Sequence, residues 1–232
     1  SGQLIGGKDR DKASSVFTES IVTALAITLL LSAEVYLLFN PILRLLKAEG
    51  ELSVFFKSYY RVMLFSYPLL VLTTIFGMFI RTDGRPQVFM GISLLESVLN
   101  FILDYVFLKK LNMGVKGSAY ATLIVKVVSC TICILYFLFS SKNIKIKRFS
   151  FDCAVFQQSM LNGSSEFIGE MAGAISMMAL NYVLMKYVGE GGVAAFTILG
   201  FAVYGYNMIT IGFGQGLSPI VSVLWGKNER EE

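Results

Sequence analysis

The sequence contains no histidine, and only 16% of its 232 residues are charged. Histidine is the usual acid–base group near neutral pH and the commonest metal ligand, so its absence removes the histidine-assisted nucleophile and the histidine metal site. Charged residues make up about 25% of a soluble domain, whereas this chain is 55% apolar with a mean hydropathy of +0.65. The composition is that of a membrane protein. Since no catalytic set of residues is visible, we expect neither an enzyme nor a cofactor or metal site.

Cysteine is also scarce, with three residues in the chain. Cys130 and Cys133 have the spacing of a redox pair, but they lie inside an apolar run, where burial opposes thiolate formation. We therefore interpret them as small apolar side chains. The net charge of +4 does not indicate a nucleic-acid partner, because the basic residues form short clusters between apolar runs and no nucleic-acid motif is present.

Long apolar runs dominate the rest of the chain. A helix needs roughly 20 mostly apolar residues to cross the hydrocarbon layer of a bilayer. Six segments meet this requirement: Ile21 to Phe39, Val62 to Ile80, Gln87 to Leu108, Gly117 to Phe139, Phe167 to Met185, and Val193 to Trp225. They are too long for barrel strands and lack alternation, so we predict an all-α integral membrane fold with six transmembrane helices. The last segment exceeds one span, so we expect it to tilt, project from the bilayer or break between Gly212 and Pro219.

The connectors between these segments form two alternating sets. Lysine and arginine are more frequent in the set made of residues 8–12, 81–86, 142–148 and 227–232 than in the other set. The positive-inside rule therefore predicts that these loops are cytoplasmic in a multi-pass protein of the cell membrane. In the second of these loops, Asp83-Gly84 is a turn signal and Pro86 can begin a helix, which predicts a tight turn.

A short repeat links the two ends of the chain. Gly7-Lys8-Asp9 near the start and Gly226-Lys227-Asn228 near the end are similar, and the distance between them would hold six helices. Repeated halves are a common plan for secondary transporters. If the repeat is real, the chain is a fragment that begins after the second helix of one half and stops after the second helix of the next.

Several stretches together resemble the multidrug and toxic compound extrusion (MATE) family. They are FIRTDGRPQ from Phe79, LNFILDYVFLKKLNMGVKGSAYATLI from Leu99, LNGSSEFIGEMAGAISMMALNYVLMKYVGEGGVAAFTILG from Leu161, and GQGLSPIVSVLWGKNE from Gly214. The order and spacing of these stretches match the family throughout. The resemblance therefore covers nearly the whole chain.

The resemblance implies a fold of twelve helices in two lobes around a central cavity, of which this chain is similar to the third to eighth helices. Residues 1–142 would end the first lobe with four helices, residues 143–156 would be the cytoplasmic linker between lobes, and residues 157–232 would start the second lobe with two helices. The implied function is export of amphipathic cationic drugs or toxic metabolites by alternating access, coupled to protons or sodium ions. The implied partners are these substrates, the lipid bilayer and the remaining helices of the same transporter.

Two glutamates inside the fifth span are the leading candidates for ion coupling or drug binding. Glu166 and Glu170 lie four residues apart on one helix face, where two like charges repel unless one takes a proton or both share a cation. The family resemblance supports Glu170, because many MATE proteins carry a glutamate in this helix. The alternative for Glu166 is a solvated position near the cytoplasmic end. Asn181 would either line a cavity or make an interhelical hydrogen bond.

Three polar residues of the third span are secondary candidates. Asn100 and Asp104 are one helical turn apart, and they would form either an ion site or a structural arrangement beside the lysines that follow. Glu96 lies deeper, and it would either face the cavity or pair with Lys126 of the next span.

Two other functions remain open at this point. A flippase for lipid-linked or polysaccharide precursors would need several buried cations for phosphate, and Lys126 is the only one inside a span. A membrane assembly protein without transport activity is disfavoured by the carboxylates within the spans.

Overall fold

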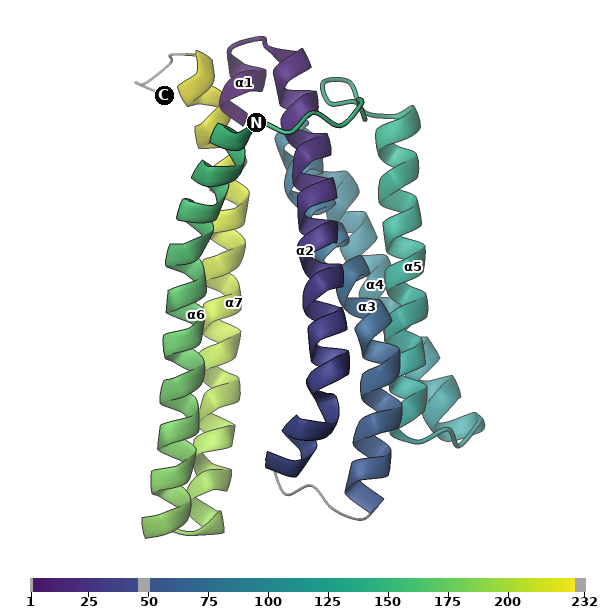
Figure 1. Cartoon of the computed structure of the whole chain (residues 1–232), viewed down its shortest axis with the longest axis vertical. Helices are drawn as coiled ribbons and strands as arrows, with labels where there is room; N and C mark the ends of the chain where they lie inside the picture. Colours follow the sequence, from purple (N-terminus) through teal and green to yellow (C-terminus); the bar gives the residue numbers. More distant parts are fainter. Residues whose placement is uncertain (1, 46–50, 228–232) are drawn as a thin grey trace. The chain divides into compact units, whose positions relative to one another are not determined.

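The computed structural model of the chain describes residues 2–45 and 51–227, without the side chains of residues 40, 42–45 and 51–55. Its helices are α1 (Gly2–Gly6), α2 (Arg10–Leu45), α3 (Glu51–Thr82), α4 (Pro86–Tyr105), the π-helical turn η1 (Val106–Lys110), α5 (Val115–Phe139), α6 (Cys153–Tyr187) and α7 (Glu190–Lys227) (Figure 1). None of the described residues lies in a β-strand. The predicted all-α fold is confirmed.

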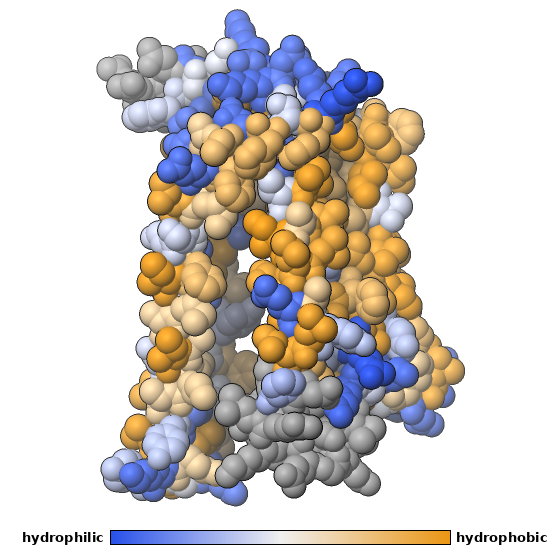
Figure 2. Space-filling view, viewed as in Figure 1, coloured by the Kyte–Doolittle hydropathy of each residue, from blue (hydrophilic) through white to orange (hydrophobic). Residues whose placement is uncertain are grey.

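Six helical segments of the described chain are long and apolar enough to cross a membrane, as the sequence predicts. They are Arg10–Phe39, Phe56–Thr82, Pro86–Lys110, Val115–Phe139, Cys153–Tyr187 and Glu190–Lys227. Figure 2 shows apolar side chains along the middle of the helices, with hydrophilic residues gathered toward the helix ends. The chain is therefore a multi-pass membrane protein.

Local sequence signals account for several helix ends. Pro86 occupies the first turn of α4, where its missing N–H is not needed. Gly84, in the turn before it, has a φ of +85°, which glycine adopts without strain. At the start of α6, the side chain of Asp152 accepts a hydrogen bond of 3.0 Å from the N–H of Ala154. α6 ends before Gly189, whose φ is +81°.

The last helix excludes one of the three expectations for the final apolar segment. α7 is one continuous helix of 38 residues that contains Pro219, so the expected break is not present. At 1.5 Å per residue the helix is about 57 Å long, nearly twice the hydrocarbon thickness of about 30 Å. It must therefore tilt or extend beyond the hydrocarbon layer.

The chain divides into two compact units, which we describe separately. The first comprises Ser1–Ser150 and Pro219–Glu232, and the second comprises Phe151–Ser218. In the first unit, α3 packs against α2, α4 and α5, and α5 also packs against α4. The arrangement places α3 and α5 at the centre of a helical bundle.

An aromatic cluster forms the core of the first unit. The Phe17 ring of α2 lies 4.3 Å from the Phe137 ring of α5 and 4.7 Å from the Phe79 ring of α3, measured between centroids. Ile144, which follows α5, is fully buried against the same cluster. Ile92 of α4 belongs to the same cluster, so the core joins α2, α3, α4, α5 and the segment after α5.

In the second unit, α6 and α7 form an antiparallel pair joined at Val188 and Gly189 (Figure 1). No residue of α6 is buried, and in α7 only Pro219, which belongs to the first unit, is buried. Both helices are rich in exposed apolar side chains, as expected for surfaces that contact lipid or other transmembrane helices. The predicted lobe boundaries remain a prediction.

Candidate functional site

The three candidates of the third span lie along one face of α4. Glu96, Asn100 and Asp104 are spaced four residues apart, so each side chain projects from roughly the same side of the helix as the one before it. All three are half-buried. α4 packs against α5, which supplies the partner of the first of these residues.

Glu96 forms an ion pair with Lys126 of α5. Its Oε2 atom lies 3.0 Å from Nζ of Lys126, and the side chains are 21% and 16% exposed. Both residues lie near the middle of 25-residue spans, Pro86–Lys110 and Val115–Phe139. An unpaired charge at that depth costs about 2.5–3.5 kcal/mol or more, and the pairing compensates each charge with the other. The structure thus shows the pairing that the sequence left open as one of two alternatives for Glu96.

Asp104 has a different environment. Its Oδ1 atom is buried and has no hydrogen-bond partner among the described residues. Among those residues the lysines that follow do not pair with it, and Nζ of Lys109 lies 5.6 Å from the centre of the Tyr105 ring instead. A buried carboxylate oxygen without a partner is costly, because it has lost its hydration without gaining a hydrogen bond. Such an oxygen can bind a proton or a cation.

The backbone changes its winding directly after Asp104. α4 ends at Tyr105 and the chain continues as the π-helical turn η1, which closes with a 3.0 Å hydrogen bond from the N–H of Leu111 to the carbonyl of Val106. π-helical turns inside helices are rare and occur frequently at functional sites. The unpartnered carboxylate and the irregular backbone therefore coincide at one place in the fold.

The leading candidates of the fifth span share one face of α6. Glu170 is the middle residue of this 35-residue helix, Glu166 lies one turn before it, and Asn181 lies three turns after it. Both carboxylates are exposed, Asn181 is half-buried, and neither carboxylate has an ion-pair partner in the described part of the chain. The structure thus brings the three predicted residues onto one polar stripe at mid-helix depth.

Two buried carboxylates, Glu19 of α2 and Asp83, were missed by the sequence analysis, which assigned Asp83 to turn chemistry alone. Asp83 is 6% exposed and accepts hydrogen bonds from Oη of Tyr136 at 2.7 Å, Oγ of Ser141 at 2.9 Å and the backbone N–H of Asn143 at 3.0 Å. A fourth, longer contact of 3.4 Å comes from the N–H of Lys142. Asp83 therefore fixes the start of the segment after α5 to the turn between α3 and α4.

The same segment is held along the beginning of α2. The N–H of Lys145 donates to Oγ of Ser14 and the N–H of Lys147 donates to Oγ1 of Thr18, both at 3.1 Å. The ammonium group of Lys147 also pairs with Asp11. The first part of the predicted linker is thus an ordered strap on the first unit, while residues 153–156 are the first turn of α6.

Comparison with known proteins agrees with this architecture. The family model described as MatE matches residues 1–106. The multidrug export protein MepA of Staphylococcus aureus (strain NCTC 8325) is 29% identical over 226 residues, which are 95% of this chain and 49% of that protein. MepA of Staphylococcus saprophyticus is 28% identical over 233 residues, with the same coverage. The chain spans about half the length of the curated relatives it matches.

Solved structures show the same helical arrangement. A MOP superfamily transporter from Pyrococcus furiosus has a TM-score of 0.86 at 25% identity over 98% of this chain and 51% of that one. A MATE in complex with MaD3S has a TM-score of 0.86 at 26% identity, covering 98% of this chain and 52% of that one. The fold is therefore that of a multi-pass helical transporter. Over nearly its whole length, the chain is similar to transporters of the MATE family.

Proposed function

We propose that the transporter containing this sequence exports amphipathic cationic drugs or toxic metabolites by alternating access in exchange for protons or sodium ions. The observation that carries the proposal is the buried, unpartnered Oδ1 of Asp104 within a membrane-spanning helix. The names of the curated relatives, which are multidrug export proteins, support the class of substrate. The transporter would lie in the cell membrane with loops 8–12, 81–86, 142–148 and 227–232 in the cytoplasm.

Asp104 suits ion coupling because its buried Oδ1 atom has no hydrogen-bond donor among the described residues. This oxygen can therefore accept a proton or contact a cation. The amide oxygen of Asn100 lies one turn away and is an oxygen ligand of the kind that hard cations prefer. Binding of either ion would remove the electrostatic cost of the unpartnered oxygen. Release would restore that cost, which is the energetic basis of exchange.

Glu170 and Glu166 suit the opposite half of the exchange cycle. Two carboxylates on one helix face attract a substrate ammonium group, and they repel each other when both are ionised and empty. Protonation of either one weakens its attraction for the substrate. Competition between a proton and a cationic drug for Glu170 would couple their movements, with Asn181 of the same face lining the drug site.

The coupling role is tested by dye efflux from cells that express the whole transporter and lack other drug exporters. The cells are loaded with a fluorescent cationic dye, and efflux is measured after an inward proton or sodium gradient is imposed. We expect Asp104→Asn to lose most of the gradient-driven rate while the protein remains in the membrane at normal abundance. Glu34→Gln, which changes an exposed carboxylate of α2, is the matched control and should export at the wild-type rate.

Three outcomes decide the proposal. If wild-type efflux follows one of the two gradients and Asp104→Asn does not, Asp104 couples that ion to transport. If Asp104→Asn keeps the full gradient dependence, the coupling role of Asp104 is refuted. If Glu170→Gln exports at the wild-type rate over a range of dye concentrations, the drug-binding role of the α6 stripe is refuted as well.

The flippase alternative has less support from the geometry. The cation that could have held a precursor phosphate, Lys126, is already paired with Glu96 at 3.0 Å. Binding a phosphate there would require breaking a half-buried ion pair, which costs about 3–5 kcal/mol. We therefore give preference to the export of cations.

A further inference from the structure

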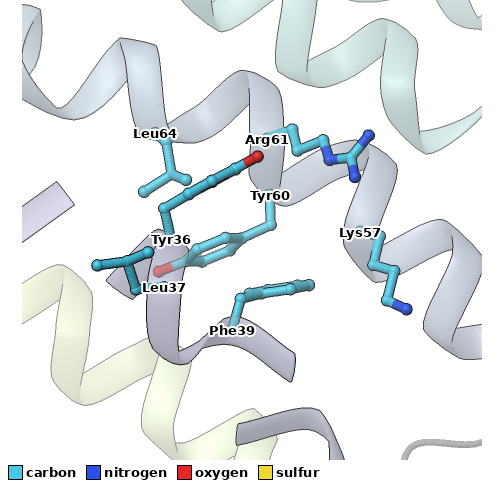
Figure 3. Close-up of a pocket in the computed structure, with 7 residues that line it drawn as sticks. All are labelled: Tyr36, Leu37, Phe39, Lys57, Tyr60, Arg61 and Leu64. Carbon is cyan, nitrogen blue, oxygen red and sulfur yellow. The ribbon is translucent and has the colours of Figure 1, made fainter. Parts of the chain in front are cut away.

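A cavity of about 350 Å³ lies between the end of α2 and the beginning of α3, within the first unit. Figure 3 shows its lining: Tyr36, Leu37 and Phe39 come from α2, and Lys57, Tyr60, Arg61 and Leu64 come from α3. The volume is at the lower end of the range of roughly 300–1,000 Å³ found for ligand sites. No residue of α4 is among the described residues that line it, and the proposed transport cycle does not use the cavity.

Among the described residues that line this cavity, two are positively charged and none is a carboxylate. Lys57 and Arg61 are one turn apart on α3, so they lie on the same helix face and repel each other. Within the described residues neither forms an ion pair, and both are exposed. Glu34, in the same part of α2, does not line the cavity. An anion placed between the two cations would relieve their repulsion.

The remaining wall of the cavity is apolar and aromatic. The rings of Phe39 and Tyr60 stack with centroids 4.8 Å apart and an interplanar angle of 22°. Leu37 and Leu64 add aliphatic surface, and the Tyr36 side chain extends from α2 toward Arg61 in Figure 3. The site thus combines a pair of cations with an apolar wall. That combination fits an amphiphile better than a small hydrophilic anion.

The position along the helices indicates where such a ligand comes from. Phe39 ends the apolar run that begins at Ile21, and Lys57 and Arg61 precede the next apolar run, which begins at Val62. The cavity therefore lies at the boundary of the hydrocarbon layer, the depth at which lipid headgroups and glycerol groups are found. Lysine and arginine side chains at the membrane surface attract the headgroups of anionic lipids.

We propose that this cavity binds the anionic headgroup of a membrane phospholipid. The headgroup phosphate lies between the ammonium group of Lys57 and the guanidinium group of Arg61, which can bind it with two parallel hydrogen bonds. The glycerol backbone contacts the stacked rings of Phe39 and Tyr60. The acyl chains continue along the lipid-facing surface of α2 and α3, because the cavity holds a headgroup and not a whole lipid.

The test measures lipid binding to the purified full-length transporter in a neutral detergent. The probes are phosphatidylglycerol, phosphatidylcholine, dodecanoate and inorganic phosphate, each titrated separately and followed by native mass spectrometry and by the thermal transition. Phosphatidylglycerol should bind and raise the transition temperature. Lys57→Gln/Arg61→Gln should weaken this binding about fivefold for each cation removed, hence about 25-fold for the double variant.

A matched control separates this site from general attraction between lipid and a basic protein. Lys109→Gln/Lys110→Gln removes two exposed lysines at the end of another span and should leave binding of phosphatidylglycerol unchanged. A second variant, Leu64→Trp, keeps both charges and fills the cavity, and it should weaken binding as well. If Lys57→Gln/Arg61→Gln and Lys109→Gln/Lys110→Gln weaken the binding of phosphatidylglycerol equally, the proposed site is refuted.

The remaining arms identify the ligand class. Equal binding of phosphatidylcholine would show that net negative charge is not required and would overturn the headgroup assignment. Competition by dodecanoate at lipid-like concentrations would assign the site to anionic amphiphiles other than phospholipids. Competition by inorganic phosphate alone would make it a soluble-anion site. None of these outcomes contradicts the proposed transport function, provided that the wild type exports the dye and Asp104→Asn loses the gradient-driven efflux.

Discussion

Asp83 offers the sharpest test of how the first unit is held together. This carboxylate is 6% exposed and accepts hydrogen bonds from Tyr136, Ser141 and Asn143 at 2.7–3.0 Å. Hydrogen bonds to a charged group contribute about 1.5–3 kcal/mol each. Because the three donors form one network, their separate values do not add.

Asp83→Ala removes the acceptor and leaves several donors without a partner. We expect a loss of about 3–5 kcal/mol, the range found when one member of a buried charged network is deleted. For a protein of 150–250 residues each kcal/mol lowers the midpoint of thermal unfolding by about 2–4 °C, so the midpoint should fall by roughly 10 °C. Asp83→Asn keeps one acceptor oxygen and should lose less than half as much.

The measurement is thermal unfolding of the detergent-solubilised protein, followed as the loss of monodisperse protein on size-exclusion chromatography. Tyr136→Phe deletes one donor to the carboxylate and should cost about 1.5–3 kcal/mol. Asp11→Ala is the control, because Asp11 has a 90% exposed side chain and forms a surface pair with Lys147, and such pairs contribute about 0–1 kcal/mol. If Asp83→Ala and Asp11→Ala lower the midpoint equally, the network does not anchor the segment after α5.

Two further changes test packing in the first unit. Glu96→Gln or Lys126→Met alone should destabilise the protein by about 3–5 kcal/mol, whereas the double variant should recover most of that loss, since no unpaired charge remains; a double variant as unstable as the sum of the singles would contradict this. Ile144→Ala should lower the stability by about 2–5 kcal/mol, because Ile144 is fully buried. Ile146→Ala, at a 46% exposed position, should cost much less. Both effects are measured by thermal unfolding, and equal effects would show that the segment after α5 does not belong to the core.

The six spans could be predicted from the sequence because the thickness of the bilayer sets a minimum apolar length. The pairing of Glu96 with Lys126 could be predicted as one alternative, because opposite charges at similar depth in consecutive helices can form an ion pair. The ends of the helices were less predictable: α2 begins at Arg10, well before the apolar run at Ile21. Polar residues continue a helix outside the hydrocarbon layer, where length and hydropathy give no signal.

The role of Asp83 could not be derived from its neighbours in the sequence. Its partners Tyr136, Ser141 and Asn143 lie 53 to 60 residues further along the chain, so the contact depends on how α3 and α5 pack. The burial of Ile144 had a weak signal, since isoleucine alternates with lysine from Ile144 to Lys147, a pattern typical of an extended segment with one buried face. The pattern would bury Ile144 and Ile146 alike, whereas Ile146 is 46% exposed, so it gives neither the extent of the buried face nor the surface that covers it.

Three carboxylates of the first unit, Asp83, Glu96 and Asp104, differ in the partners that the fold gives them. Asp83 is surrounded by donors and Glu96 is paired with a lysine, so the negative charge of each is already compensated by partners within the fold. Asp104 has a buried oxygen without a partner among the described residues, so an ion arriving there changes its energy most. An exchange cycle needs a site whose occupied and empty states differ in energy. Within this unit, Asp104 meets that requirement where Asp83 and Glu96 do not.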